Sequence, residues 1–109
     1  MAELKIALKV HDKDNVATIF AEGVLDGAEV ELRDKKGTRE TLSVFGNIPY
    51  GHKIATRAIA PGEPIIKYGE QIGVAIKRIR RGEYVHVHNL DSMRGRGDLP
   101  PREGKPDEL

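Results

Sequence analysis

Three glycine-centred corners constrain the fold of this chain more than any other sequence feature. In each corner a glycine lies three positions after one apolar residue and three positions before another. The corners span residues 24–30 around Gly27, 59–65 around Gly62 and 79–85 around Gly82. Glycine supplies the positive φ of a tight turn at little steric cost, and the flanking apolar residues can anchor both arms in one core. The irregular spacing of the corners argues against a solenoid and favours a compact, folded-over β structure.

Alternation of apolar and polar residues predicts the strands that join these corners. The expected strands cover residues 4–10, 29–33, 41–45, 53–59, 65–68 and 84–90. The polar residues 34–37 predict a hairpin turn between the second and third of them. Residues 71–79 fit either a short helical turn or another strand. We therefore expect an all-β fold with short strands and at most one or two short helical turns.

The composition fits one small domain and excludes several classes of protein. The chain has 109 residues, of which 39% are hydrophobic and 32% charged, enough for a single modest core. The absence of cysteine excludes a disulfide framework, a thiolate zinc site and a cysteine nucleophile. With a formal charge of +1, the chain has no strong net charge that would attract it to nucleic acid or membranes. No signal peptide and no apolar run of about 20 residues is present, so the cytoplasm is the expected compartment.

The end of the sequence differs in character from the rest. Residues 91–109 contain three prolines and three glycines among mostly charged residues, with few apolar anchors. Such a segment cannot bury enough surface to order itself, and it is expected to be a tail. The domain is therefore expected to comprise residues 1–90.

His86 and His88 are the most informative candidates for chemistry. On a strand they would project from the same face, with Val85 and Val87 behind them in the core. Two imidazoles in this arrangement can bind a metal ion or transfer protons near neutral pH. A partly exposed polar face is the more ordinary interpretation, and no Asp or Glu follows at the spacing that usually completes a metal site. Asn89 would point to the opposite face, where it is expected to close a turn or orient a loop.

Three further residues are candidates for the same site. His52 opens an expected strand and would join the histidine pair if the two strand ends are neighbours. Lys53 and Lys67 are candidate anchors for a carboxylate group. Each has a plain alternative, since single histidines and lysines of this kind are commonly hinge or solvent-exposed residues.

Four ordered blocks of this sequence resemble the N-terminal domain of the altronate and galactarate dehydratases. The blocks are GHKIA (51–55), IAPGEPIIKYG (59–69), IG (72–73) and GEYVHVHN (82–89). The resemblance covers residues 42–99 with high specificity, because several ordered blocks agree, and the first 40 residues more loosely. It implies the β-clip fold of the antifreeze-like SAF group.

The resemblance also implies an activity. Members of this family are hydro-lyases that remove water from a six-carbon aldonic or aldaric acid and leave a 2-keto-3-deoxy acid. They are associated with a divalent metal, often iron. In many members this domain precedes a much larger catalytic domain. In others, including relatives that cleave sulfonate from sulfolactate, the two parts are separate chains.

This sequence stops after its tail, so we expect the separate arrangement, with a small subunit that is inactive without a large catalytic subunit. His52, His86 and His88 are expected to be catalytic, the last two also as candidate metal ligands. Lys53, Lys67 and Asn89 are expected to bind the sugar acid. The metal, Fe²⁺ among the candidates, is expected to be held mainly by the large subunit.

Other hypotheses fit the same residues. The SAF fold also serves as a non-enzymatic binding module. The histidine pair alone would suit a stand-alone metalloprotein. Within the leading hypothesis the choice among altronate, galactarate and sulfolactate stays open, because the specificity residues are expected on the other chain. A homo-oligomer also stays open, since short exposed strands can pair with a partner.

Overall fold

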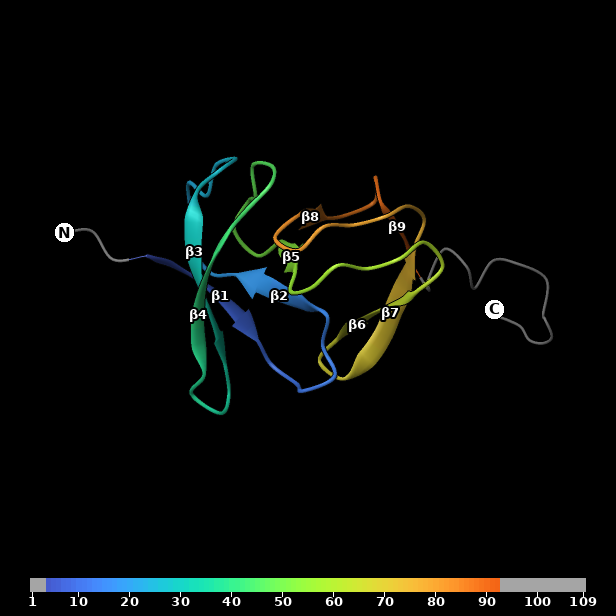
Figure 1. The fold of residues 1–109 in the computed structure, drawn as a ribbon, viewed down its shortest axis with the longest axis horizontal. Coiled ribbons are helices and arrows are strands. Elements are labelled where there is room, and N and C mark those ends of the chain that lie inside the picture. The colour runs from blue at the N-terminus through green and yellow to red at the C-terminus, as the bar shows by residue number, and fades with distance from the viewer. Residues whose placement is uncertain (1–3, 93–109) are drawn as a thin grey trace.

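The computed structural model describes residues 4–92, which form two β-sheets joined by turns (Figure 1). The strands are β1 (Lys5–Lys9), β2 (Val16–Ile19), β3 (Glu29–Asp34), β4 (Arg39–Ser43), β5 (Lys53–Ala55), β6 (Pro64–Lys67), β7 (Glu70–Ala75), β8 (Tyr84–Val85) and β9 (Leu90–Ser92). The larger sheet has the order β4-β3-β1-β2-β5-β8, and the smaller sheet has the order β6-β7-β9. The expected all-β fold is confirmed. Residues 4–92 include no helix long and apolar enough to cross a membrane.

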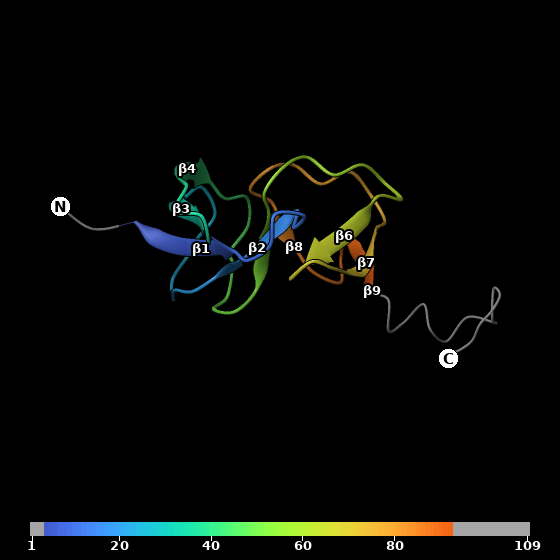
Figure 2. The same cartoon turned by 90° about the horizontal axis from the view of Figure 1, so that it is seen from below.

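The two sheets share a core. Figure 2 shows the small sheet at one end of the molecule and β3 and β4 at the other, with β2 and β8 between them. One apolar cluster lies inside the large sheet, around Val30 and Ile54. A second cluster joins residues of both sheets, among them Val16 of β2, Ile65 of β6 and Leu90 of β9. This second cluster holds the small sheet against the end of the large one.

The three glycine corners form as the sequence predicts. Gly27, Gly62 and Gly82 have φ values of 85°, 84° and 88°. The apolar residues that flank them are all buried: Val24, Val30, Ile59, Ile65, Ile79 and Val85. The second and third corners also bond to each other, because Ile59 and Ile79 exchange both backbone hydrogen bonds, at 2.8 and 2.9 Å. The second and third corners therefore build part of the second core cluster, whereas Val24 and Val30 of the first corner belong to the cluster of the large sheet.

Strand β2 is an element that the sequence analysis missed. All four of its residues are buried, because β2 lies between β1 and β5 in the middle of the large sheet. A strand that is buried on both faces shows no alternation of polar and apolar residues. In β1 the alternating apolar residues Ile6 and Leu8 are only half-buried, and Ala7 between them is the fully buried residue.

The strand expected at residues 84–90 is wrong. Strand β8 ends at Val85, residues 86–89 form a turn, and a separate strand β9 follows. The side chain of Asn89 closes this turn, since its Oδ1 accepts a hydrogen bond from the His86 N–H at 3.0 Å and its Nδ2 donates to the Tyr84 carbonyl at 2.9 Å.

Other boundaries also shift. The strand expected at 53–59 ends at Ala55, and most of the ambiguous segment 71–79 belongs to β7. The expected domain boundary at residue 90 falls inside β9, which pairs with β7 through Ser92. The rest of the expected tail, residues 93–109, lies outside the described residues.

Candidate active site

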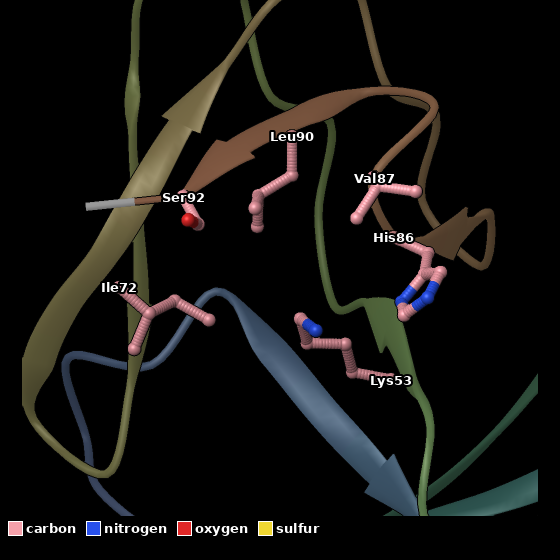
Figure 3. A pocket seen from close by; sticks show the side chains of 6 residues that line it. All are labelled: Lys53, Ile72, His86, Val87, Leu90 and Ser92. Carbon is pink, nitrogen blue, oxygen red and sulfur yellow. The ribbon is translucent and has the colours of Figure 1, made fainter. Parts of the chain in front are cut away.

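A pocket of about 520 Å³ opens where the two sheets meet. Figure 3 shows its lining: Lys53 from β5, Ile72 from β7, His86 and Val87 from the turn after β8, and Leu90 and Ser92 from β9. The side chains of Lys53 and His86 both extend into this space, and Ile72 and Leu90 supply apolar surface. The pocket thus combines two nitrogen-bearing groups with an apolar wall, which suits a small polar ligand.

The three predicted histidines gather beside this pocket around one tyrosine. The ring centroids of His52 and His86 lie 4.8 Å apart. Tyr84 stacks on His86 at 5.7 Å with the ring planes 10° apart, and its ring centroid lies 5.5 Å from that of His88. The Tyr84 hydroxyl is 2.6 Å from Nδ1 of His52. His52 therefore converges with the other two histidines, as the sequence analysis expected, and we call these four residues the His–Tyr cluster.

His86 and His88 lie on a different kind of element from the expected one. His86 and His88 lie on the turn between β8 and β9, not on a continuous strand. As a consequence, Val85 is buried as expected, whereas Val87 is 71% exposed and the expectation that it belongs to the core is wrong. Val87 instead lines the pocket.

Tyr84 is the member of the cluster that the sequence analysis missed. In the sequence it reads as an ordinary aromatic strand residue. Its position becomes significant only through the pairing of β8 with β5, in which Tyr84 lies opposite Ile54. That pairing is long-range, so the only available signal was the block of residues that Tyr84 shares with His86.

The electrostatics of the pocket favour a neutral imidazole at His86. Partial burial, the positive charge of Lys53 and the neighbouring His52 and His88 lower the pKa of His86 below its ordinary value. Burial and the charge of Lys67 likewise lower the pKa of Lys53. His86 can therefore accept a proton, and the two lysines make this side of the molecule attractive to an anion.

The other two predicted binding residues differ in what they can do. Lys67, on β6, lies close enough to Lys53 for its positive charge to lower the pKa of Lys53. The Nζ of Lys67 lies 5.0 Å from the ring centroid of Tyr68. Asn89 is fully buried, and both ends of its amide are bound to the backbone. This is the turn-closing role that the sequence analysis also considered, and direct contact with a substrate would require that turn to open.

The described residues do not form a metal site by themselves. Within residues 4–92, no group of three or more His, Cys, Asp or Glu side chains is arranged to hold a metal ion. Nδ1 of His52 is engaged by Tyr84. His86 and His88 as ligands of a metal shared with another chain stay a prediction.

Comparison with known proteins gives a consistent set of relatives. The model of the altronate/galactarate dehydratase SAF domain matches residues 5–93. This match begins well before residue 42, so the first 40 residues belong to the same domain more firmly than the sequence analysis expected.

Individual relatives differ in length. The (2R)-sulfolactate sulfo-lyase subunit alpha of Chromohalobacter salexigens is 39% identical over 94 residues, which cover 84% of this chain and 99% of that protein. The altronate dehydratase of Escherichia coli is 38% identical over 82 residues, which are 75% of this chain and 15% of the enzyme. The galactarate dehydratase (L-threo-forming) of Escherichia coli is 41% identical over 80 residues, which are 72% of this chain and 14% of the enzyme. The chain thus spans nearly all of the first relative but only a small part of the two dehydratases.

Proposed function

The chain belongs to the SAF-domain family of the altronate and galactarate dehydratases, and we propose that it is the small subunit of a two-chain lyase that acts on a hydroxy acid. The observation that carries this proposal is the pocket into which Lys53 and His86 both extend, beside His52. A pocket with cationic groups and a neutral imidazole suits the removal of a proton next to a carboxylate.

Three of the predicted residues have a role in the proposed elimination. Lys53, with the charge of Lys67 nearby, binds the substrate carboxylate and stabilises the negative charge that develops when the neighbouring C–H bond breaks. Neutral His86 takes that proton and becomes an imidazolium. The electron pair of the C–H bond becomes a carbon–carbon double bond, and the leaving group departs from the next carbon with the electrons of its own bond. The enol that remains then tautomerises to a keto acid.

The arrangement of the chain supports a site shared with a large subunit. Ser92, the last described residue, lines the pocket. In the altronate dehydratases the matching region is N-terminal and makes up about a seventh of the enzyme, so most of the polypeptide follows it along the chain. Val87 presents an exposed apolar side chain at the pocket. A second chain lying here would enclose the substrate and cover Val87.

The leaving group distinguishes two forms of the proposal. In the hydro-lyase form, a sugar acid such as altronate or galactarate loses hydroxide, which gains a proton and leaves as water. Three relatives that are altronate or galactarate dehydratases, 37–41% identical, favour this form. In the sulfo-lyase form, sulfolactate loses sulfite. The near-complete coverage of a sulfolactate sulfo-lyase subunit alpha favours this second form.

Reconstitution tests the proposal. The chain is purified alone and together with a large lyase subunit, and both preparations receive altronate, galactarate or sulfolactate with Fe²⁺ supplied. We expect keto acid only from the pair, accompanied by sulfite if sulfolactate is the substrate. A pair that forms no keto acid from any of the three acids would contradict the proposal. Activity of the isolated chain would contradict the shared site.

The remaining expectations belong to the same proposal. A divalent metal, if one is used, is assigned to the large subunit, and metal analysis of each chain separately tests this. Tight stoichiometric metal on the isolated small chain would instead favour a stand-alone metalloprotein. The cytoplasmic location and a homo-oligomeric state stay predictions.

A further inference from the structure

Tyr84 has no part in the elimination described above, although it contacts every histidine of the cluster. Its hydroxyl lies 2.6 Å from Nδ1 of His52, its ring is stacked on His86, and it also lies against His88. A single side chain that touches three imidazoles can set the position and the protonation of all of them.

The backbone holds Tyr84 firmly in place. Its N–H donates to the Phe45 carbonyl at 3.0 Å, and its carbonyl accepts from the Asn89 amide at 2.9 Å. Behind it, the backbone of Gly46 passes so close that a Cβ at that position would lie 3.2 Å from the Tyr84 Cβ. Its ring also packs against the core cluster of the large sheet. The hydroxyl is therefore presented to His52 from a fixed point.

The hydrogen bond between Tyr84 and His52 links the tautomer of His52 to the direction of donation, since a hydroxyl can donate to an unprotonated Nδ1 or accept from Nδ1–H. A neutral imidazole carries one proton, on either Nδ1 or Nε2, and the other nitrogen is an acceptor. A tyrosine hydroxyl has one proton to donate, and it can donate that proton to Nδ1 only when Nδ1 is unprotonated. With the Tyr84 hydroxyl donating to Nδ1, the ring proton of His52 must lie on Nε2. When the ring is charged, Nε2 carries a proton as well, so this nitrogen is a donor in both states.

We propose that Tyr84 is a positioning residue whose hydroxyl donates to Nδ1 of His52 and so fixes His52 as the Nε2–H tautomer, which makes His52 a hydrogen-bond donor and His86 the proton acceptor of the same site. Two imidazoles 4.8 Å apart would otherwise be interchangeable in role. The hydroxyl touches His52, whereas only the ring face of Tyr84 lies against His86, so the two histidines are made chemically unequal.

The catalytic role of His52 and His86 rests on the proposed function, but the tautomer of His52 does not. In the hydro-lyase form, Nε2–H of His52 would donate a hydrogen bond to the departing hydroxide, which takes up the proton that His86 removed from carbon and leaves as water. His52 keeps its own proton throughout, and the transfer from His86 returns that ring to its neutral starting state. The tautomer of His52 can be measured separately, on the isolated chain with no substrate and no partner.

The first test is a long-range ¹H–¹⁵N correlation spectrum of the ¹⁵N-labelled full chain, recorded well above the ordinary histidine pKa of about 6.5. We expect the His52 ring to show the Nε2–H pattern alone. In Tyr84→Phe, which keeps the ring and loses the hydroxyl, the Nδ1–H form should appear beside it. An Nδ1–H pattern in the unaltered chain, or an unchanged pattern in Tyr84→Phe, would overturn the proposal. Tyr50→Phe removes a hydroxyl only two residues from His52 on a side chain that is 54% exposed, and it should change nothing.

The second test uses the active pair. Tyr84→Phe should lower kcat about tenfold, the worth of one hydrogen bond, with KM nearly unchanged. An unaltered kcat in a variant that has lost the Nε2–H pattern would refute the catalytic half of the proposal. If the spectra behave as expected but the unaltered pair has no lyase activity, the proposed function fails and the positioning of His52 by Tyr84 stands.

Discussion

The ring of His86 lies 4.8 Å from the ring of His52, with the ring planes 38° apart, although one residue follows strand β8 and the other precedes strand β5. These two strands pair antiparallel, Lys53 opposite Val85, which brings the start of one beside the end of the other. Two groups that can transfer protons therefore meet at one edge of the large sheet, beside a pocket that also receives Lys53. The proximity of His52 and His86, and the turns that produce it, have consequences that can be tested.

The charge of Lys53 should be measurable in the titration of His86. Because burial and Lys53 both lower the pKa of His86, we expect it to titrate below the ordinary value of about 6.5. Lys53→Met removes the nearby charge and should raise the pKa. Lys35→Met removes an exposed lysine of the hairpin turn between β3 and β4 and should leave it unchanged. NMR titration of the histidine ring protons measures both effects. No change in the pKa of His86 in Lys53→Met would show that the two side chains do not interact.

The lowered pKa of His86 also fixes the sign of a pH effect on stability. The unfolded chain binds a proton at His86 at a higher pH than the folded chain does. The contribution of neutral His86 to the free energy of unfolding is therefore fully present above about pH 6.5. It is lost as the pH falls through the pKa that His86 has in the folded chain. We expect urea unfolding to show a fall in stability on acidification that is smaller in His86→Gln. Equal falls in the two proteins would contradict this assignment.

His86 should be essential for the proposed elimination. In the reconstituted pair, His86→Ala should reduce kcat by about 10²–10⁴-fold, the usual contribution of a general base. His11→Ala is the matched control, because His11 is the one histidine of the chain outside the cluster and it binds the Lys13 N–H in a different turn. A pair that keeps its activity with His86→Ala would remove this residue from the catalytic site and leave only the pocket.

Asn89 should matter for stability more than for substrate binding. Asn89→Ala leaves the His86 N–H and the Tyr84 carbonyl without this buried partner, which should cost about 1–3 kcal/mol in the free energy of unfolding. Asn47→Ala removes an exposed side chain that accepts one hydrogen bond from the Asp26 N–H, and it should cost less. Urea denaturation compares the two. A smaller loss for Asn89→Ala than for Asn47→Ala would mean that the turn is held by other contacts.

The features that the sequence predicted are those that depend on neighbouring residues. The corners at Gly27, Gly62 and Gly82 need only a glycine and two apolar anchors, and all three form. The hairpin between β3 and β4 is equally local, since the residues that turn the chain lie between its two arms. The contact of His52 with the histidine pair is an exception, because it joins distant parts of the chain; it was expected only if the two strand ends are neighbours, and the pairing of β5 with β8 makes them so.

The features that were missed depend on contacts between distant parts of the chain. Strand β2 has no polar face because other elements cover both of its faces. The segment after β8 alternates like a strand, but the side chain of Asn89 offers the backbone a competing set of hydrogen bonds and closes a turn instead. Tyr84 becomes central only through the pairing of β8 with β5. No local pattern carries that information.

The two corners at Gly62 and Gly82 should respond very differently to the same substitution. Both glycines have a positive φ, 84° and 88°, so alanine at either position should cost about 1 kcal/mol in backbone strain. A Cβ on Gly62 would meet open space, whereas a Cβ on Gly82 would overlap the Ser43 carbonyl oxygen and lie 3.1 Å from Leu42 Cδ1. Gly82→Ala should therefore cost about 1–3 kcal/mol more than Gly62→Ala, because the chain before β8 must move away from β4. Since β8 carries Tyr84 and leads directly into His86, that movement should also disturb the cluster. Urea denaturation measures the first effect and the ring signals of His52 and His86 the second, and equal behaviour of the two variants would show that this corner does not position the site.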